Sequence, residues 1–458
     1  MRAPEIDKLL GIEVYATDTQ GIGGVIRSSI DDFVVEEVLV DGSVARIEKA
    51  ADSRVLGVSA SRQRYLLCVL VKRNWDTFVA IKNIAKQLGV AQEQIQIAGI
   101  KDAKAITAQH ITIENISMEE AAAINVKDIE IRPMGYFRDE LSAYYLLGNK
   151  FKITVKAVKL ARSTVEKRVA KTIENLEALG GIPNFFGHQR FGSTRPITHL
   201  TGKAIIQGDF EEAAMLFLAK PSVHEHPSSR QAREELQSTR DFRGALASFP
   251  KQLRFERIML RHLVDCPNDF VGAFTRLPVR LQELFVQGYQ SYLFNRFLSE
   301  RIENGFSLGA SEVGDYVVNV ERSGLPMIKT GKIVTAETRE QTNKLLKLGR
   351  ARVALPLVGT RQKLSEGVMG QIERRVLEAE GVEKSSFRVD AIPRISGKGQ
   401  LRALVSPIND FEVHRILHSG ENLNENQVEL SFMLLRGSYA TMLLREIMKP
   451  RNPIAAGF

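Results

Sequence analysis

Residues 150–157 alternate between apolar and polar side chains over their whole length. The apolar set is Phe151, Ile153, Val155 and Ala157, and the polar set is Lys150, Lys152, Thr154 and Lys156. Because successive side chains of a strand point to opposite faces, this period of two predicts a β-strand with one buried and one exposed face. A second alternation, of Val428, Leu430, Phe432 and Leu434, predicts another such strand near the far end of the chain.

The lysines on the polar face of residues 150–157 belong to a chain that is basic as a whole. Its 458 residues contain 63 Lys and Arg against 54 Asp and Glu, which leaves a net charge of +9. A content of 44% hydrophobic and 26% charged residues is typical of a folded protein, with enough chain for two or three domains. The charge favours a polyanionic partner, and Lys152 is then a candidate phosphate contact. The alternative is a positive surface that meets only solvent.

The cysteines and the N-terminus indicate the cellular compartment. Cys68 and Cys266 lie far apart and form no metal-ligand cluster, and Cys68 is expected to be a buried, reduced thiol within the apolar run 65–71. Residues 1–10 lack the apolar core of a signal peptide, and no apolar run is long enough to cross a membrane. We therefore predict a cytoplasmic protein without a metal site.

A glycine, a lysine and an aspartate stand together in residues 98–112, which read A-G-I-K-D-A-K-A-I-T-A-Q-H-I-T. Gly99 permits backbone geometry that other residues resist, and Lys101 beside Asp102 would keep that carboxylate ionised. An ionised carboxylate that two strands carry on a loop is a candidate reactive group. The alternative is an ordinary turn.

Residues 182–192, I-P-N-F-F-G-H-Q-R-F-G, combine three phenylalanines with several hydrogen-bonding side chains. Stacking on bases together with hydrogen bonding would use this mixture, and Arg190 supplies a positive charge within it. The alternative is an aromatic loop that packs on the core.

The chain changes character between about residues 204 and 384. Four cations, Lys251, Arg254, Arg257 and Arg261, recur every three or four residues and predict one basic helix face. Residues 282–303 predict an amphipathic helix. Arg254 and Arg257 are candidate RNA contacts on a second domain, although a solvated helix face is the alternative for both.

Near the C-terminus, residues 436–439, R-G-S-Y, follow the second alternating strand and precede a predicted helix at 440–448. A Gly-Ser turn between a strand and a helix can bind an anion at the N-terminus of the helix.

Four stretches taken together resemble the TruD family of pseudouridine synthases. They are D-F-V-V-E-E at 32–37, G-I-K-D-A-K-A-I-T-A-Q at 99–109, N-F-F-G-H-Q-R-F-G at 184–192 and R-G-S-Y-A-T-M-L-L-R-E at 436–446. The run Q-S-Y-L-F-N-R at 290–296 is similar to the inserted domain of that family. The motifs keep the family's order over nearly the whole chain, and the length of the chain resembles the archaeal branch. Leu435 departs from the family, because many members carry proline there.

The resemblance implies an isomerase that converts a uridine of tRNA, typically at position 13, to pseudouridine. It places the catalytic aspartate on Asp102, acting as nucleophile or as base, with Lys101 beside it. A flipped base would enter a pocket and stack on aromatic rings. The other active-site residues that the resemblance implies are Arg27, where other members have lysine, Phe33, Asn184, Phe186 and Tyr439. Arg27 would pair with Asp102 or hold a phosphate, and Asn184 would bind the uracil edge or position the aspartate.

The resemblance also implies an α+β fold, with a pseudouridine synthase core around a mostly antiparallel sheet and an inserted α/β TRUD domain. The core would be discontinuous, built from residues 1–203 and 385–458, and the insertion would span 204–384. RNA would lie in the cleft between the two parts. The reaction needs no cofactor and no metal, and we expect a monomer whose partner is tRNA.

Two other functions compete with this interpretation. An RNA-binding protein or tRNA chaperone with the same fold would bind RNA and form no product. An RNA methyltransferase would need a glycine-rich cofactor loop between a strand and a helix, and no such loop stands out in the sequence.

Overall fold

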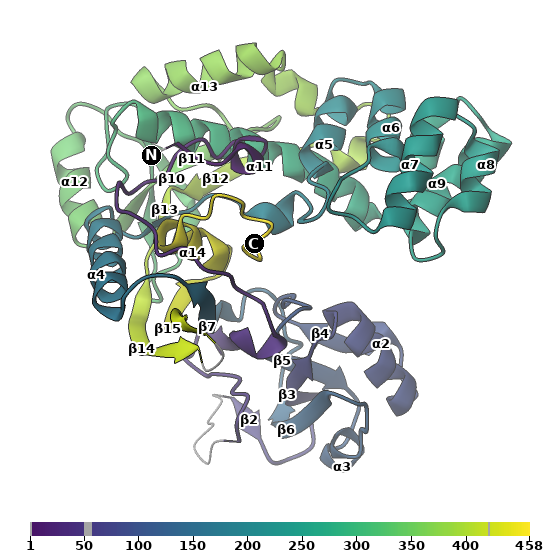
Figure 1. Ribbon diagram of the computed structural model, residues 1–458, viewed down its shortest axis with the longest axis horizontal. Coiled ribbons are helices and arrows are strands. Elements are labelled where there is room, and N and C mark those ends of the chain that lie inside the picture. Colours follow the sequence, from purple (N-terminus) through teal and green to yellow (C-terminus); the bar gives the residue numbers. More distant parts are fainter. Residues whose placement is uncertain (1, 50–56, 420–421) are drawn as a thin grey trace.

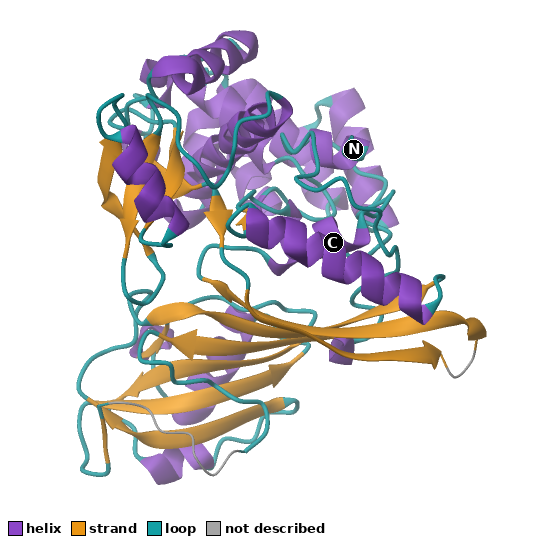
Figure 2. Cartoon of the chain, turned by 90° about the vertical axis from the view of Figure 1, so that its left-hand side faces the viewer, coloured by secondary structure: helices purple, strands orange, loops and turns teal. Residues whose placement is uncertain are grey.

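The structure, a computed structural model, describes residues 2–49, 57–419 and 422–458. Its largest element is a nine-stranded sheet in the order β14-β15-β7-β1-β5-β3-β6-β2, with β4 paired to β5 (Figures 1 and 2). Within the described part of this sheet only β1 and β5 pair in parallel. The predicted α+β class with a mostly antiparallel sheet is thus confirmed. The strands are β1 (Phe33–Leu39), β2 (Val58–Ser59), β3 (Tyr65–Arg73), β4 (Ile95–Ile97), β5 (Ile106–Glu114), β6 (Ile129–Phe137), β7 (Leu146–Val158), β14 (Asn409–Ser419) and β15 (Asn422–Leu435).

Both alternating segments are strands of this sheet, at neighbouring positions. Phe151, Ile153 and Val155 of β7 are buried, as predicted. The alternation ends earlier than expected, because Ala157 has a positive φ of 56° and the next residue, Val158, takes the buried position. A change of register between β15 and β7 accompanies this irregularity.

Helices cover one face of the sheet at both of its ends. At the β7 and β15 end, α4 (Arg162–Ala178) and α14 (Ala440–Met448) share a hydrophobic cluster with strand residues that include Ile153 and Leu430. At the β3 and β6 end, α2 (Thr77–Leu88) and α3 (Met118–Ala122) close a second cluster around Cys68, which is fully buried. As the sequence indicates, α2 begins at the cap Asp76, which accepts bonds from two backbone N–H groups, and ends at Gly89 with a φ of 66°. The site described below is lined in part by residues of the first cluster, which include Phe33 and Phe151.

The rest of the chain forms a helical region beside a small sheet (Figure 1). Strands β9 (Tyr316–Val320), β10 (Pro326–Ile333), β11 (Ala351–Leu357) and β12 (Gln400–Ala403) pair in the order β10-β9-β11-β12, and β8 (Ile182–Pro183) pairs with β13 (Val405–Ser406). The remaining helices are α1 (Glu5–Lys8), α5 (Thr198–Ile206), α6 (Phe210–Ala219), α7 (Pro227–Thr239), α8 (Phe242–Ser248), α9 (Arg254–Asp265), α10 (Phe270–Thr275), α11 (Val279–Glu303), α12 (Arg339–Lys347) and α13 (Gly367–Glu380). No helix among the described residues combines the length and the apolar character that crossing a membrane requires.

Helix α11 has buried residues on all sides and is not the amphipathic helix that the sequence predicts for residues 282–303. Its polar side chains Gln290 and Asn295 are buried, because they bond to backbone groups of other segments. Gln290 Nε2 donates to Val358 O at 2.6 Å, and Asn295 Nδ2 donates to Leu10 O at 2.9 Å. A helix whose buried polar residues are satisfied in this way can be covered on all sides.

Contacts cross both of the predicted domain boundaries. Helix α5 includes residue 204 and packs along α11, and β12, which follows residue 384, completes the small sheet by pairing with β11. The division at 204 and 384 therefore stays a prediction, with backbone pairing linking the parts on either side of residue 384.

Candidate active site

Asp102 lies on the loop between β4 and β5, and one of its carboxylate oxygens is held by two side chains. Arg27 Nη2 donates to Asp102 Oδ1 at 3.0 Å, and Gln189 Nε2 donates to the same atom at 2.6 Å. Among the described residues, no protein donor contacts the second oxygen, Oδ2. Asp102 lines a pocket of about 230 Å³, which we call the Asp102 pocket. The carboxylate is thus fixed through one oxygen and offers the other to a molecule in the pocket.

The cation beside Asp102 is Arg27, and not the adjacent Lys101 that the sequence suggests. The Arg27 guanidinium also donates to Gly457 O at 2.9 Å and lies 4.0 Å from the centre of the Phe33 ring. Burial lowers the pKa of Arg27, while the charge of Asp102 and the hydrogen bond to it act in the opposite direction. The Arg27 backbone has a φ of 59°, a conformation that is unfavourable for a residue with a side chain. This strained backbone brings the guanidinium to the carboxylate.

Lys101 also lines the pocket, but its ammonium is paired with a buried carboxylate on β1. Its ammonium forms an ion pair with Glu37, whose other oxygen accepts from His110 N at 3.0 Å and lies 3.3 Å from His110 Nδ1. Burial alone would raise the pKa of Glu37, but the charge of Lys101 and the hydrogen bonds from His110 and Lys101 outweigh it and hold that pKa below its usual value. The pair anchors the residue next to Asp102 in the sheet.

Lys72 on β3 fixes the loop through its backbone. Lys72 Nζ donates to Asp102 O and to Trp75 O, both at 2.7 Å, and burial lowers the pKa of Lys72 to about 8.

Gly99 has no positive φ, so the expected need for a special backbone conformation is not found. A Cβ at Gly99 would instead lie 3.1 Å from Leu146 Cδ2 and 3.3 Å from Lys101 Nζ, so glycine leaves room for the buried lysine.

The other walls of the Asp102 pocket come from β1 and from the turn before α14. Phe33 and Tyr439 both line the pocket, as does the exposed Ile100. The Gly-Ser turn at 437–438 is tied down by a bond of 2.7 Å between Ser438 Oγ and Ser406 Oγ. The structure thus brings Arg27, Phe33 and Tyr439 to Asp102, as the sequence suggests.

Asn184, Phe186 and Arg190 line a second pocket, of about 550 Å³, that adjoins the first. Arg436 lines both pockets, and the rings of Phe186 and Tyr439 meet edge to face with centres 6.3 Å apart. Asn184 does not contact Asp102, because its side chain bonds to Ala403 O at 3.0 Å and to Arg402 Nη2 at 2.7 Å. The expected positioning of the aspartate by Asn184 is therefore not found.

Phe186 is covered in the structure rather than open to a base. Its side chain is buried, and the Arg402 guanidinium carbon lies 3.9 Å from the centre of its ring. Phe294 packs edge to face against the same ring, with centres 5.6 Å apart. Direct stacking of a flipped base on Phe186 would first require Arg402 to move.

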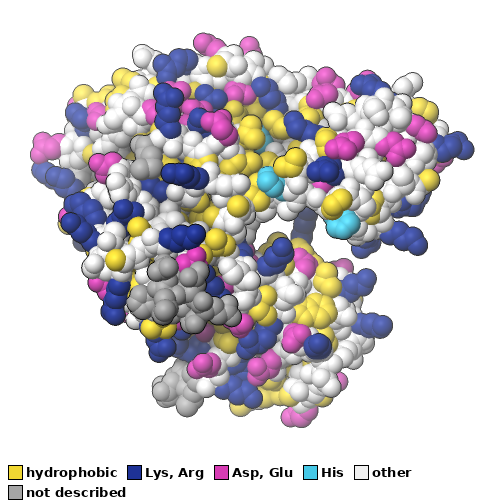
Figure 3. Space-filling view, in the orientation of Figure 1, with side chains coloured by type: hydrophobic (Ala, Val, Ile, Leu, Met, Phe, Trp, Pro, Cys, Tyr) yellow, Lys and Arg dark blue, Asp and Glu magenta, His cyan; other side chains and the backbone are white. Residues whose placement is uncertain are grey.

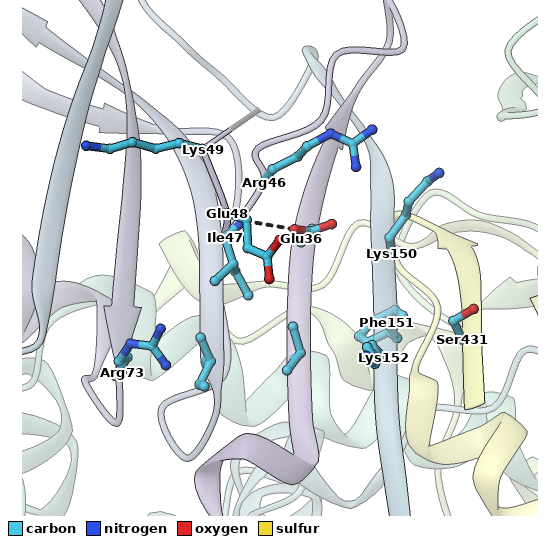
Figure 4. Close-up of a pocket in the computed structure, with 12 residues that line it drawn as sticks. Glu36, Arg46, Ile47, Glu48, Lys49, Arg73, Lys150, Phe151, Lys152 and Ser431 are labelled. Carbon is cyan, nitrogen blue, oxygen red and sulfur yellow. Dashed lines mark hydrogen bonds between the residues drawn. The ribbon is translucent and has the colours of Figure 1, made fainter. Parts of the chain in front are cut away.

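The remaining candidate RNA contacts, Lys152, Arg254 and Arg257, lie elsewhere. Lys152 borders a groove on the open face of the sheet, and Figure 4 shows it with Phe151, near Ser431. Its ammonium pairs with Glu429 at 3.1 Å, so its charge is already matched. On α9, Arg254 is exposed, whereas Arg257 donates to Leu246 O at 2.7 Å and to Phe249 O at 2.8 Å and so caps α8.

No group of three or more His, Cys, Asp or Glu side chains within the described ranges is placed to hold a metal ion. Of the two histidines that flank Glu225, His226 caps α7 through Nδ1, which accepts from Ser228 N at 3.3 Å. Its ring is thus used in the local fold.

Comparison with known proteins places this fold in a class. A solved crystal structure from Methanosarcina mazei, described as TruD, matches with a TM-score of 0.82 and 39% identity, over 99% of this chain and 100% of that one. The fold is thus that of a tRNA pseudouridine synthase. A family model, "tRNA pseudouridine synthase D (TruD)", matches residues 9–447. The chain belongs to the TruD family and is an isomerase of this type.

Relatives described as "Probable tRNA pseudouridine synthase D" support this assignment. One from Methanosarcina mazei is 40% identical over 457 residues, which is 99% of each chain. One from Thermococcus sibiricus is 35% identical over 439 residues, 95% of this chain and 97% of that protein. These archaeal relatives agree with the branch that the chain length suggests.

Proposed function

We propose that this enzyme converts one uridine of tRNA to pseudouridine with Asp102 as the reacting carboxylate, at position 13 as the family resemblance implies. The observation that carries the proposal is the asymmetry of the Asp102 carboxylate. One oxygen takes two hydrogen bonds from Arg27 and Gln189, and the other faces the pocket without a protein donor among the described residues. A nucleophile or a base must have such an accessible oxygen.

The reaction is an isomerisation in which all atoms of the uridine are kept apart from exchange of protons. The bond between N1 and C1′ breaks, the freed uracil turns, and a bond forms between C5 and C1′. The hydrogen on C5 leaves as a proton, and N1 ends with one. Asp102 acts at the sugar, either by attacking C1′ or by removing a proton, and Arg27 holds the carboxylate in place through its hydrogen bond to Oδ1.

The uridine reaches the pocket by leaving its stack in the RNA, because a pocket of about 230 Å³ admits a base and not a helix. Phe33 and Tyr439 supply its aromatic walls. The space-filling view shows a hollow between the upper helical region and the lower lobe that carries α2 and β4, with Lys and Arg side chains on its walls (Figure 3). We assign the RNA to this hollow.

Release of tritium from uridine labelled at C5 tests the proposal, because C5 loses its hydrogen only when it becomes the glycosidic carbon. Wild type is expected to release tritium from unmodified tRNA, and Asp102→Asn to be slower by at least about 10³-fold with tRNA binding kept. The matched control is Asp128→Asn, at an exposed turn position with a φ of 62° that asparagine also tolerates.

The rival function, RNA binding without chemistry, predicts no release by wild type from any tRNA pool together with normal affinity. Release by both wild type and Asp102→Asn would keep the reaction and remove Asp102 from its role. Mapping the product to a uridine other than position 13 would overturn only the assignment of the position.

A further inference from the structure

The pocket next to the Asp102 pocket carries positive charge without a matching carboxylate. Three arginines, Arg190, Arg402 and Arg436, line it together with the amides Gln287 and Gln290, and none of its lining residues is acidic. We call it the guanidinium pocket. It contrasts with the groove in Figure 4, whose Lys49, Lys150 and Lys152 pair with carboxylates at 3.8, 3.5 and 3.1 Å.

All the hydrogen-bond partners of these arginines are neutral. Arg190 donates to Ser291 Oγ at 3.2 Å and to Gln287 Oε1 at 3.1 Å. Arg402 donates to Asn184 O, Asn184 Oδ1 and Gly437 O at 3.0, 2.7 and 2.8 Å. Arg436 donates to the backbone carbonyls of Ala143 and Leu146. Each guanidinium is thus oriented by neutral dipoles. Among the described residues, no carboxylate bonds to it and offsets its positive charge.

Elsewhere in this chain, buried arginines are matched by acids. Arg301 pairs with Asp315 at 2.8 Å, Arg445 with Asp7 at 2.6 Å and Arg233 with Glu256 at 2.7 Å. The arginines of the guanidinium pocket are half-buried, and a single half-buried arginine, Arg257, also bonds only to carbonyls. The pocket differs because it gathers three such charges, and a ligand that supplies negative charge would offset the cost of bringing them together.

The positive charges in the guanidinium pocket also lie close to one another. The guanidinium carbons of Arg402 and Arg190 lie 3.9 and 5.6 Å from the centre of the same Phe186 ring. Burial lowers the pKa of Arg402 to about 10, and the charge of Arg190 acts in the same direction. An anion between these groups would relieve both the desolvation and the repulsion.

We propose that the guanidinium pocket binds a phosphate of the RNA strand beside the uridine that enters the Asp102 pocket. The inference rests on the proposed function and names the part of the substrate that this second pocket takes. Arg436 borders both pockets, so a strand whose base occupies the first passes the second. A phosphate suits the site better than a base edge, because guanidinium groups bind phosphate oxygens in pairs of bonds and a base brings no charge.

The first test compares Arg190→Gln with Arg190→Lys. Glutamine removes the charge, whereas lysine keeps it. We expect Arg190→Gln to bind unmodified tRNA about tenfold more weakly at low salt. The slope of log affinity against log salt should become shallower by about 0.7–0.9, the value for one phosphate contact, and Arg190→Lys should restore it. The control is Arg374→Gln, at an exposed arginine on α13.

The second test changes the RNA as well as the protein. Single phosphates within two nucleotides of the target uridine are replaced by neutral methylphosphonates in tRNAs assembled by ligation. Wild type should lose affinity at one of these linkages, and Arg190→Gln should show no further loss at that linkage while still losing affinity at others. Such non-additivity identifies the two groups as partners.

Equal losses for wild type and Arg190→Gln at every linkage, or an unchanged salt slope in Arg190→Gln, would overturn the inference. Tritium release by wild type on the unmodified tRNA distinguishes a failure of the proposed function from a failure of the inference about the guanidinium pocket. Its absence would overturn the proposed function, whereas release with unchanged phosphate dependence would overturn only the guanidinium pocket.

Discussion

The Asp102 pocket and the guanidinium pocket are neighbours that differ in whether their charged side chains have partners of opposite charge. Around Asp102 both carboxylates are paired with a cation of the chain, since Arg27 pairs with Asp102 and Lys101 with Glu37. In the guanidinium pocket three arginines have only neutral partners. The first pocket is therefore complete before RNA arrives, and the second is completed by what binds there.

This difference separates residues that organise the reacting group from residues that hold the substrate. A residue of the first kind should change the stability of the protein or the rate of the chemical step. A residue of the second kind should change affinity and its dependence on salt. The following predictions test that separation, from the largest expected effect to the smallest.

The largest effect is expected for Glu37→Gln. The substitution leaves the buried Lys101 ammonium without its counter-ion, so we expect the free energy of unfolding in urea to fall by about 3–5 kcal/mol. Adding Lys101→Met should recover part of this loss, because the uncompensated charge is then gone. In Glu429→Gln the exposed pair with Lys152 is broken instead, at a cost below about 1 kcal/mol. Equal losses of stability in the two single variants would show that the buried Glu37–Lys101 pair stabilises the protein no more than the Glu429–Lys152 pair does.

Arg27→Gln is expected to slow tritium release by about 100-fold, because Asp102 loses its ion pair and one donor. Arg27→Lys, which matches other family members, should stay within about tenfold of wild type since it keeps the charge. The affinity for tRNA should change little, in contrast to Arg190→Gln. Single-turnover rates and equilibrium binding measured on the same preparations check this. A weaker affinity with an unchanged rate would move Arg27 into the substrate-holding group.

The two arginines of α9 extend the comparison to the helical region. Arg257→Gln removes both bonds to the C-terminal carbonyls of α8, and we expect a loss of about 1–2 kcal/mol in stability. Arg254→Gln at the exposed start of α9 should be within about 0.5 kcal/mol of wild type. If the basic face contacts RNA, Arg254→Gln makes the salt slope of tRNA binding shallower. An unchanged affinity over a salt series would assign Arg254 to a solvated face.

Local features of the fold could be predicted from the sequence because they depend on neighbouring residues. The alternation in β7 and β15, the cap at Asp76 and the stop at Gly89 all follow from spacing and side-chain type. Helix α11 was mispredicted as amphipathic, because a hydrophobic pattern does not show that Gln290 and Asn295 find backbone partners in distant segments.

The residues near Asp102 were predictable only in part, for the same reason. The motifs contain Asp102, and the resemblance places Arg27 ahead of the first motif. The partner of Lys101 depends instead on the parallel pairing of β1 with β5, which sets Glu36 opposite Ala108 and brings Glu37 to His110. Glu37 and Gln189 stand within the motifs that carry the family resemblance, so both residues could have been chosen as candidate site residues from the sequence. Arg402 lies outside those motifs, and the pairing of β13 with β8, with the bond from Asn184 N to Leu404 O, brings its segment beside Asn184.

The last prediction concerns the dependence of stability on pH, to which Glu37 contributes as one of 54 acidic residues. The pKa of Glu37 is lower in the folded protein than its ordinary value of 4.5, so the folded state binds fewer protons there than the unfolded chain. The stability from this group is therefore fully present above about pH 4.5 and is lost as the pH falls through the folded-state pKa. Urea unfolding of wild type and Glu37→Gln from pH 7 to pH 3 should give curves that converge in acid. Parallel curves would show that the charge of the Glu37 carboxylate adds no stability to the folded protein. The Glu37–Lys101 pair would then no longer support the contrast between the two pockets.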